Sequence, residues 1–215
     1  PITGRDAGLL KKMGVKRPFH VTGVGIDLED LHTEAVETEA PSLFYLGSLD
    51  WLPNLEGLDW FIKEVWPRVH KVHPKVPMYI AGRNMPDKYR HLRGKNLFGI
   101  GEVESAGAFI KSKDIMVVPI LSGSGMRVKI VEGMAYHKPM VATSIAAEGI
   151  PVASGREMLL ADDPIAFADA VNLLLEQPHT RATLAENAGN CIRQRFDNDR
   201  LSQDLLAFYQ KQLDK

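Results

Sequence analysis

The segment 114–143 constrains the fold of this chain most, because it has the pattern of a complete strand, loop, helix and strand. Its first apolar run, 115–118, stops at Pro119, which has no N–H to donate to a sheet ladder. An amphipathic helix that carries Glu132 is expected next, and the apolar run 140–143 follows it. Two strands joined through a helix in this way are expected to lie parallel in one sheet.

The loop of this unit, residues 122–127, is expected to bind an anion. Gly123 and Gly125 have no Cβ atom, so the backbone can approach a ligand closely there. The helix that follows directs unpaired N–H groups and the positive end of its dipole toward the loop. Because Arg127 and Lys129 add positive charge in its first turn, a phosphate group is the expected ligand.

Glu132 allows two interpretations. Helical side chains lean toward the N-terminus, so its carboxylate can lie near the loop and accept hydrogen bonds from sugar hydroxyls. Acidic residues bind ribose in this way in dinucleotide-binding folds. Alternatively, Lys129 and Glu132 form an exposed ion pair three positions apart, worth roughly a few tenths of a kcal/mol.

Short apolar runs alternate with amphipathic segments along the chain. The expected strands are 19–22, 43–46, 76–81, 97–100, 115–118, 140–143 and 159–161. The expected helices are 6–12, one capped by Asn54, 105–111, one from the glycine loop to about 136, 165–176, 180–194 and 200–213. The acidic segment 28–41 is expected to be a surface connection. This alternation predicts an α/β fold, a Rossmann-like doubly wound parallel sheet with helices on both faces. We expect one domain, 1–215, with C-terminal helices at about 180–213.

Composition excludes several classes of protein. The chain has 45% hydrophobic and 25% charged residues, as globular domains do, and its formal net charge is −1. Bulk charge therefore does not favour nucleic acid as a partner. The single cysteine, Cys191, excludes an internal disulfide and a cysteine-based zinc site. With no apolar run of about 18 residues and no signal-peptide pattern, a cytoplasmic location is expected.

Several motifs together resemble the C-terminal, nucleotide-binding domain of glycosyltransferase family 4, whose members have the GT-B architecture of two facing Rossmann-like domains. The similarity covers nearly the whole chain, and the motifs occur in the family's order. They are a turn similar to NG-x-D at 24–27, a strand similar to FVGRL at 44–49, a G-x-V loop at 101–103, and a P…G…EAMA-x-G-x-PVVAT pattern at 119–143.

The resemblance implies transfer of a sugar from a nucleotide diphosphate donor such as UDP-sugar or GDP-sugar, with retention of anomeric configuration, in glycan or polysaccharide synthesis. It implies that Glu132 holds the ribose hydroxyls, and that the backbone of the 101–103 loop meets the base. The implied nucleotide-binding residues are Glu132, Gly101, Val103, Gly47 and Ser48. The implied diphosphate-binding residues are Gly123, Ser124, Gly125, Met126, Arg127, Lys129 and Arg83. No metal and no other cofactor is expected, because the helix dipole and cations neutralise the leaving diphosphate.

This sequence departs from the family pattern at the cations. The family commonly has an arginine and a lysine where this chain has Ser48 and Asn54, and a glutamate where it has Ser124. Because the loop carries Arg127 and Lys129, we interpret the difference as a relocation of charge. Arg83 is either a further diphosphate ligand or a solvated charge.

A second departure is the absence of an N-terminal acceptor domain, which would need about 150 further residues. The chain is therefore expected to be a donor-binding fragment without a catalytic residue or turnover of its own, from a protein that is peripheral to a membrane. Two other functions stay open: a dinucleotide-binding domain of an oxidoreductase, and a non-catalytic nucleotide-binding or scaffolding module of Rossmann type. The first lacks an early G-x-G-x-x-G motif.

Overall fold

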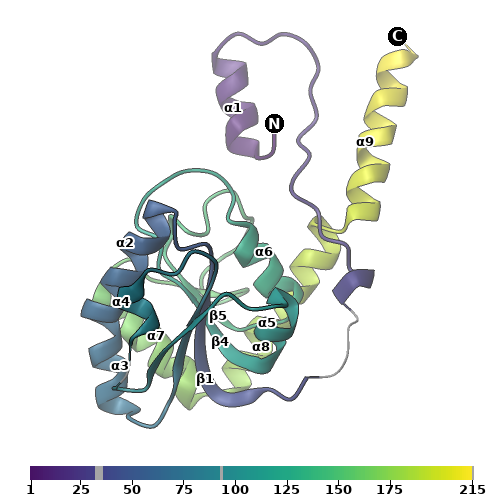
Figure 1. The fold of residues 1–215 in the computed structure, drawn as a ribbon. Helices are drawn as coiled ribbons and strands as arrows, with labels where there is room; N and C mark the ends of the chain where they lie inside the picture. The colour runs from purple at the N-terminus through teal and green to yellow at the C-terminus, as the bar shows by residue number, and fades with distance from the viewer. Residues whose placement is uncertain (32–35, 93, 215) are drawn as a thin grey trace.

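A single sheet of six parallel strands forms the centre of the computed structural model, which describes residues 1–31, 36–92 and 94–214 (Figure 1). The strands are β1 (Glu39–Leu46), β2 (Met78–Ala81), β3 (Leu97–Gly101), β4 (Lys113–Val118), β5 (Met140–Ala142) and β6 (Leu159–Leu160). Their order is β3-β2-β1-β4-β5-β6. The chain thus builds outward from β1 in one direction and from β4 in the other, and ligands of such sheets bind where this order reverses.

Helices cover both faces of the sheet, which confirms the predicted doubly wound Rossmann-like class. Alternate β1 side chains show why: Leu43 and Tyr45 pack on one face and Phe44 on the other, and all three are fully buried. One face is covered by α2 (Leu52–Trp60), a π-helical turn η2 (Phe61–Val65), α3 (Trp66–Val72) and α7 (Pro164–Glu176). The other is covered by α5 (Ala106–Ser112), α6 (Val128–Ala135) and α8 (Pro178–Arg195). A short helix, α4 (Asp87–Arg90), packs against β3.

The π-helical turn between α2 and α3 has a cause in the sequence. Pro67 lies in the first turn of α3 and has no N–H, so it cannot continue the α-helical ladder. The N–H of Trp66 instead donates to the carbonyl of Phe61, five positions earlier. The helical segment therefore continues past the proline, and Trp66 stays fully buried with its indole N–H donated to the Lys95 carbonyl at 2.9 Å.

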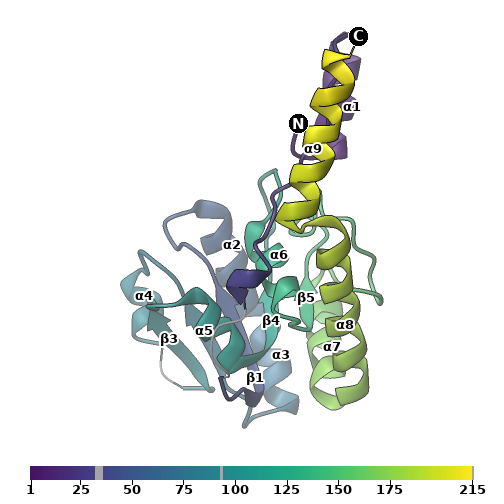
Figure 2. The same ribbon diagram turned by 90° about the vertical axis from the view of Figure 1, so that its right-hand side faces the viewer.

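Two helices project from the sheet body on the same side, α1 (Gly4–Lys12) and α9 (Asn198–Leu213) (Figures 1 and 2). No α9 residue is buried, although its apolar residues lie on one side of the helix. The rings of His20 and Phe208 lie 5.5 Å apart, so the N-terminal segment contacts α9. The predicted C-terminal helices at about 180–213 correspond to α8 and α9.

Three details of the sequence-based prediction are wrong. The segment 19–22 pairs with no strand in the described part of the chain; only Ile26 forms a bridge, to Asp197. Asn54 does not cap α2, which begins at Leu52 after Trp51, because its side chain is buried in other hydrogen bonds. The segment 28–41 includes a 3₁₀ turn η1 (Glu29–Leu31) and the first residues of β1, while 32–35 fall outside the described residues.

Candidate functional site

A pocket of about 350 Å³ opens at the carboxyl edge of the sheet, where β1, β2 and β3 end and α6 begins. It lies at the position where the strand order predicts a ligand. Its walls are formed by Leu46, Gly47, Ser48, Gly82, Arg83, Glu102, Val103, Glu104, Ala106, Lys129 and Glu132.

The pocket brings together half of the residues that the sequence singled out, from four separate segments. These are Gly47, Ser48, Arg83, Val103, Lys129 and Glu132. Gly101 lies directly beside it, since its carbonyl accepts from the N–H of Gly82 at 2.8 Å. The remaining predicted residues, Gly123, Ser124, Gly125, Met126 and Arg127, do not line this pocket.

Glu132 presents a carboxylate that none of the described protein groups satisfies. Its side chain is half-buried at the pocket wall, and it makes no hydrogen bond or ion pair with any residue that the structure describes. Burial raises the pKa of Glu132, and the charge of Lys129 opposes that rise. A partly desolvated carboxylate without a partner is costly, so a ligand that donates hydrogen bonds, such as a pair of hydroxyls, stabilises it.

Lys129 does not pair with Glu132, which contradicts the interpretation of these two residues as a surface ion pair. Its Nζ donates to Tyr45 Oη at 3.0 Å and to Asn54 Oδ1 at 2.9 Å, and it lies 4.5 Å from the centre of the Tyr45 ring. Burial, and then the charge of Arg127, lowers the pKa of Lys129 to about 7. Gly47 makes room for this side chain, since a Cβ there would lie 2.3 Å from Nζ.

Arg127 serves the glycine loop rather than the pocket. Its side chain is 5% exposed, and its Nη1 donates to the carbonyls of Ser124 and Gly125, each at 2.6 Å. Nη2 donates to the Ser122 carbonyl at 3.3 Å, and the guanidinium lies 5.1 Å from the centre of the Trp51 ring. The guanidinium thus fixes the loop before α6 by three hydrogen bonds to its backbone.

In the segment after β1, Asp50 holds the hydroxyl of the pocket residue Ser48. The Asp50 carboxylate accepts from Ser48 Oγ at 2.6 Å and from Asn84 Nδ2 at 2.8 Å. These hydrogen bonds, first that from Ser48, hold the pKa of Asp50 below its usual value. The hydroxyl of Ser48 therefore already donates a hydrogen bond within the protein. Arg83, in the segment after β2, also lines the pocket.

Sequence reasoning missed several pocket residues. Glu102 and Glu104 add carboxylates to the wall, and Glu102 stands between two predicted residues, Gly101 and Val103. Gly82 has a φ of 153°, and a Cβ there would lie 1.8 Å from the Gly47 carbonyl oxygen. Only glycine allows the loops after β1 and β2 to approach this closely. The glycines at the ends of β1, β2 and β3, which are Gly47, Gly82 and Gly101, are the signal in the sequence that these strand ends form one rim.

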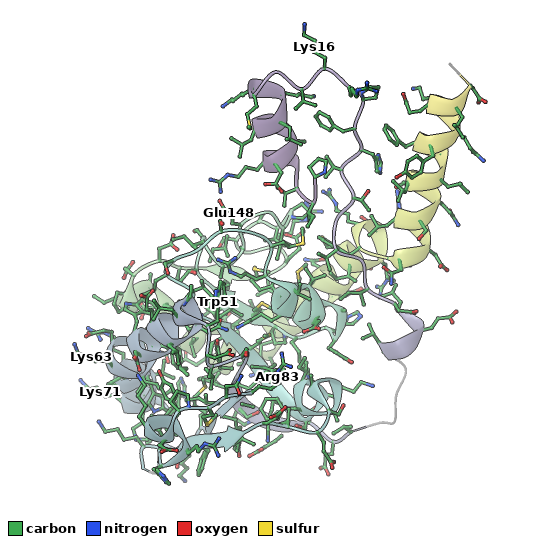
Figure 3. The ribbon with its side chains drawn as sticks, turned by 45° about the horizontal axis from the view of Figure 1, so that its top comes forward. Lys16, Trp51, Lys63, Lys71, Arg83 and Glu148 are labelled. Carbon is green, nitrogen blue, oxygen red and sulfur yellow. The ribbon has the colours of Figure 1, made fainter. Side chains whose placement is uncertain are left out.

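Ser124 and Gly125 line a separate cavity of about 340 Å³, between the glycine loop and α1. Arg5 of α1 forms an ion pair there with Glu148, which follows β5. Figure 3 shows Trp51, Arg83 and Glu148 on the side of the body that faces the viewer, with Glu148 nearest α1. The glycine loop thus faces the N-terminal helix across this cavity.

Two further features are absent from the described ranges. No three histidine, cysteine, aspartate or glutamate side chains are grouped so that they hold a metal ion. No helix among these residues combines the length and the hydropathy that crossing a membrane requires.

Comparison with known proteins shows which family this chain resembles. The family model described as glycosyl transferases group 1 matches residues 40–177. A phosphatidyl-myo-inositol mannosyltransferase of Mycobacterium leprae is 26% identical over 231 residues, which cover 92% of this chain and 62% of that protein. The chain spans about half the length of the curated relatives it matches.

Solved structures share the fold. HepE of Anabaena, in complex with UDP and glucose, superposes with a TM-score of 0.72 and 16% identity over 97% of this chain and 61% of HepE. The C-terminal domain of LpcC, a group 1 glycosyl transferase family protein of Francisella tularensis, has a TM-score of 0.66 and 16% identity and covers 81% of this chain and 100% of that domain. Because the family model matches more than half of its residues, this chain belongs to the group 1 glycosyl transferases.

Proposed function

We propose that this chain is the donor-binding half of a retaining glycosyltransferase, which moves a hexose from a nucleoside diphosphate sugar to an acceptor in glycan or polysaccharide synthesis. The observation that carries the proposal is the presence of Glu132 and Lys129 in the wall of one pocket. Among the residues that the structure describes, the Glu132 carboxylate has no hydrogen-bond or ion-pair partner, and the Lys129 amino group donates to two neutral acceptors. Such a pair matches a ligand with hydroxyls at one end and negative charge at the other.

In this proposal the ribose hydroxyls donate to Glu132, and the base lies along the 101–103 loop. The diphosphate lies toward Lys129, Arg83 and the N-terminus of α6, whose first N–H groups have no helical partners. As the bond between sugar and diphosphate breaks, negative charge builds on the leaving group. Fixed cations and backbone N–H groups that face this charge lower the barrier.

The role proposed for Arg127 is indirect. Its guanidinium is held by the carbonyls of Ser122, Ser124 and Gly125, so it shapes the glycine loop and keeps a positive charge beneath it. Gly123 and Gly125 have φ values of 93° and 91°, in the left-handed region that favours glycine. The loop is therefore preorganised for an anion without a direct contact from Arg127.

The acceptor site, and with it turnover, belongs in this proposal to a second domain that this chain does not include. The relatives are longer than this chain, and the matched domain of LpcC stands as a unit, which supports the division. Three further expectations rest on the sequence alone. They are that no metal is required, that the fragment is inactive by itself, and that the protein acts in the cytoplasm at a membrane surface.

Calorimetric titration of the purified chain with UDP, GDP, ADP, NAD and free uridine tests the proposal. HepE binds UDP, which makes UDP the first ligand to test. We expect one nucleoside diphosphate to bind more tightly than its nucleoside and more tightly than NAD. A preference for NAD would point to an oxidoreductase, and failure of every nucleotide to bind would point to a scaffolding module.

A further inference from the structure

Two buried side chains accept hydrogen bonds from the amino group of Lys129, which lies near the N-terminus of α6. Its Nζ donates to Tyr45 Oη and Asn54 Oδ1, and both of these neighbours are buried, at 0% and 3% exposure. The amide of Asn54 is fixed at its other end, because its Nδ2 donates to the Ser48 carbonyl at 2.6 Å. Since that bond uses the NH₂ group, the oxygen must face Lys129.

The charged groups around Lys129 leave its amino group without a counter-ion. On its own helix segment stand Arg127 and Glu132, and on the loops that line the pocket stand Asp50, Arg83, Glu102 and Glu104. None of these carboxylates lies within 4.0 Å of Nζ among the residues that the structure describes. Tyr45, the titratable group from β1, is neutral, because burial raises its pKa far above its usual value.

We propose that Asn54 and Tyr45 are positioning residues that hold the Lys129 amino group toward the pocket while supplying no negative charge, so that the bound anion is its counter-ion and anion binding takes up a proton at Nζ. This inference rests on the proposed function, in which the anion is the diphosphate of the donor. It goes further by assigning roles to two residues outside the pocket wall. It also makes the affinity depend on pH.

The proton balance follows from the burial of the amino group. Because burial lowers the pKa of Lys129 to about 7, a substantial fraction of molecules is expected to carry a neutral amine in the empty pocket near neutral pH. A diphosphate near Nζ favours the ammonium form, so one proton from solution adds to the amine as the ligand binds. Affinity for a nucleoside diphosphate is therefore expected to fall by up to about tenfold per pH unit above pH 7. Affinity for the uncharged nucleoside is expected to stay constant.

Calorimetry of the whole chain with UDP at pH 8, in two buffers of different ionisation enthalpy, measures this proton directly. At pH 8 the terminal phosphate of UDP, with a pKa of about 6, is already ionised and contributes no proton. We expect uptake of most of one proton per UDP bound. The Lys129→Met variant is expected to lose both the uptake and much of the affinity.

The Asn54→Asp variant separates positioning from packing, since it keeps the shape of the side chain and adds a carboxylate beside Nζ. We expect Lys129 to stay protonated in the empty pocket, proton uptake to disappear, and UDP affinity to fall about tenfold. Asn187→Asp is the matched control, because the Asn187 amide also bonds one backbone carbonyl, that of Arg156, but away from the pocket. It should leave affinity and uptake unchanged.

If Asn54→Asp does not fold, Tyr45→Phe replaces it, because it removes one acceptor and keeps the ring. It is expected to move the midpoint of the pH profile of UDP affinity down by about one unit. UDP binding by the unaltered chain at pH 8 without proton uptake would overturn this inference and leave the proposed function intact. Absence of binding by any nucleoside diphosphate would overturn both.

Discussion

The side-chain oxygen of Asn54 accepts a hydrogen bond from Nζ of Lys129 at 2.9 Å, although the two residues lie 75 positions apart. The side chain of Lys129 thus extends from the first turn of α6 to residues of β1 and α2. Family 4 glycosyltransferases, which this chain resembles, commonly carry a lysine where this chain has Asn54. The hydrogen bond puts the amino group of Lys129 beside that position, as expected if a charge has moved from one helix to another.

Replacing Glu132 with glutamine is expected to weaken binding of a nucleoside diphosphate about tenfold or more, since a hydrogen bond to a charged group contributes about 1.5–3 kcal/mol. The melting temperature should not fall, because the carboxylate has no partner among the described residues to lose. Calorimetry with UDP and with 2′-deoxy-UDP measures the effect. The loss should be smaller for the deoxy ligand, and equal losses would mean that Glu132 does not bind this hydroxyl.

Replacing Arg127 with alanine is expected to lower the free energy of unfolding by about 2 kcal/mol, because the buried guanidinium donates to three backbone carbonyls of the glycine loop, and these hydrogen bonds are lost. Urea denaturation measures this change. Arg68→Ala, which removes a largely exposed arginine paired with Glu64, is the control and should cost less than about 1 kcal/mol. An unchanged stability together with a strong loss of UDP binding would show that Arg127 contacts the diphosphate itself.

Replacing Gly47 with alanine is expected to push the Lys129 amino group away from its acceptors, since the new Cβ would lie 2.3 Å from Nζ. The side chain of Lys129 is flexible at that end, so the fold should tolerate the change while UDP affinity falls about tenfold. Gly8→Ala, in open space on α1, should leave affinity unchanged. Full affinity in Gly47→Ala would mean that the position of Nζ does not matter for binding.

Replacing Gly82 with alanine, unlike Gly47→Ala, is expected to lower the stability of the fold. Its Cβ would lie 1.8 Å from the rigid Gly47 carbonyl oxygen, and its φ of 153° is unsuited to alanine. We expect stability to fall by about 3 kcal/mol or more, measured by urea denaturation. A variant as stable as the unaltered chain would show that the loops after β1 and β2 do not approach in this way.

Stability is expected to rise with pH between about 7 and 10. Burial lowers the pKa of Lys129 to about 7 and that of Lys138 to about 8, against 10.5 for ordinary lysine. In that interval the unfolded chain binds more protons than the folded one, so each lysine adds up to about 1.4 kcal/mol per pH unit to the stability. Above this interval the trend reverses, because burial raises the pKa of the buried Tyr45 and of the half-buried Tyr79, which ionise first in the unfolded chain.

Urea denaturation at several pH values checks this profile. The Lys129→Met and Lys138→Met variants should each flatten it. Lys138 donates to the carbonyls of Lys111 and Lys113 and lies away from the pocket, so its variant should keep full affinity for nucleotides. A profile that is flat in the unaltered chain would mean that neither lysine is desolvated.

The sheet could be predicted from the sequence because each of its strands is a short apolar run between turn residues. The segment 19–22 was wrongly predicted as a strand, because an apolar run indicates a tendency to form a strand but not whether a partner strand is available. Residues 20 and 21 belong to no ladder, and the His20 ring contacts Phe208 of α9 instead. The π-helical turn before Pro67 could not be predicted either. A proline alone predicts the end of a helix, and the burial of Trp66 accompanies its continuation here.

Only half of the residues predicted for the candidate site line the pocket. Glu132 and Lys129 reach the pocket because the first turns of α6 lie at the carboxyl edge of β1 and β4, which the motif order implied. Arg127 does not, because a long side chain at a helix N-cap can turn either toward a ligand or back to its own loop. Sequence patterns do not distinguish these two directions. In the structure the guanidinium turns back to its own loop, where it donates to three backbone carbonyls.

The most direct measurement is a crystal structure of this chain with the nucleoside diphosphate that binds most tightly. The account predicts the ribose hydroxyls within hydrogen-bond distance of the Glu132 carboxylate, and the diphosphate within reach of Lys129 Nζ, with Asn54 and Tyr45 still holding the amino group. A nucleotide bound outside the pocket lined by Glu132 and Lys129, or bound there with its ribose away from Glu132, would contradict it.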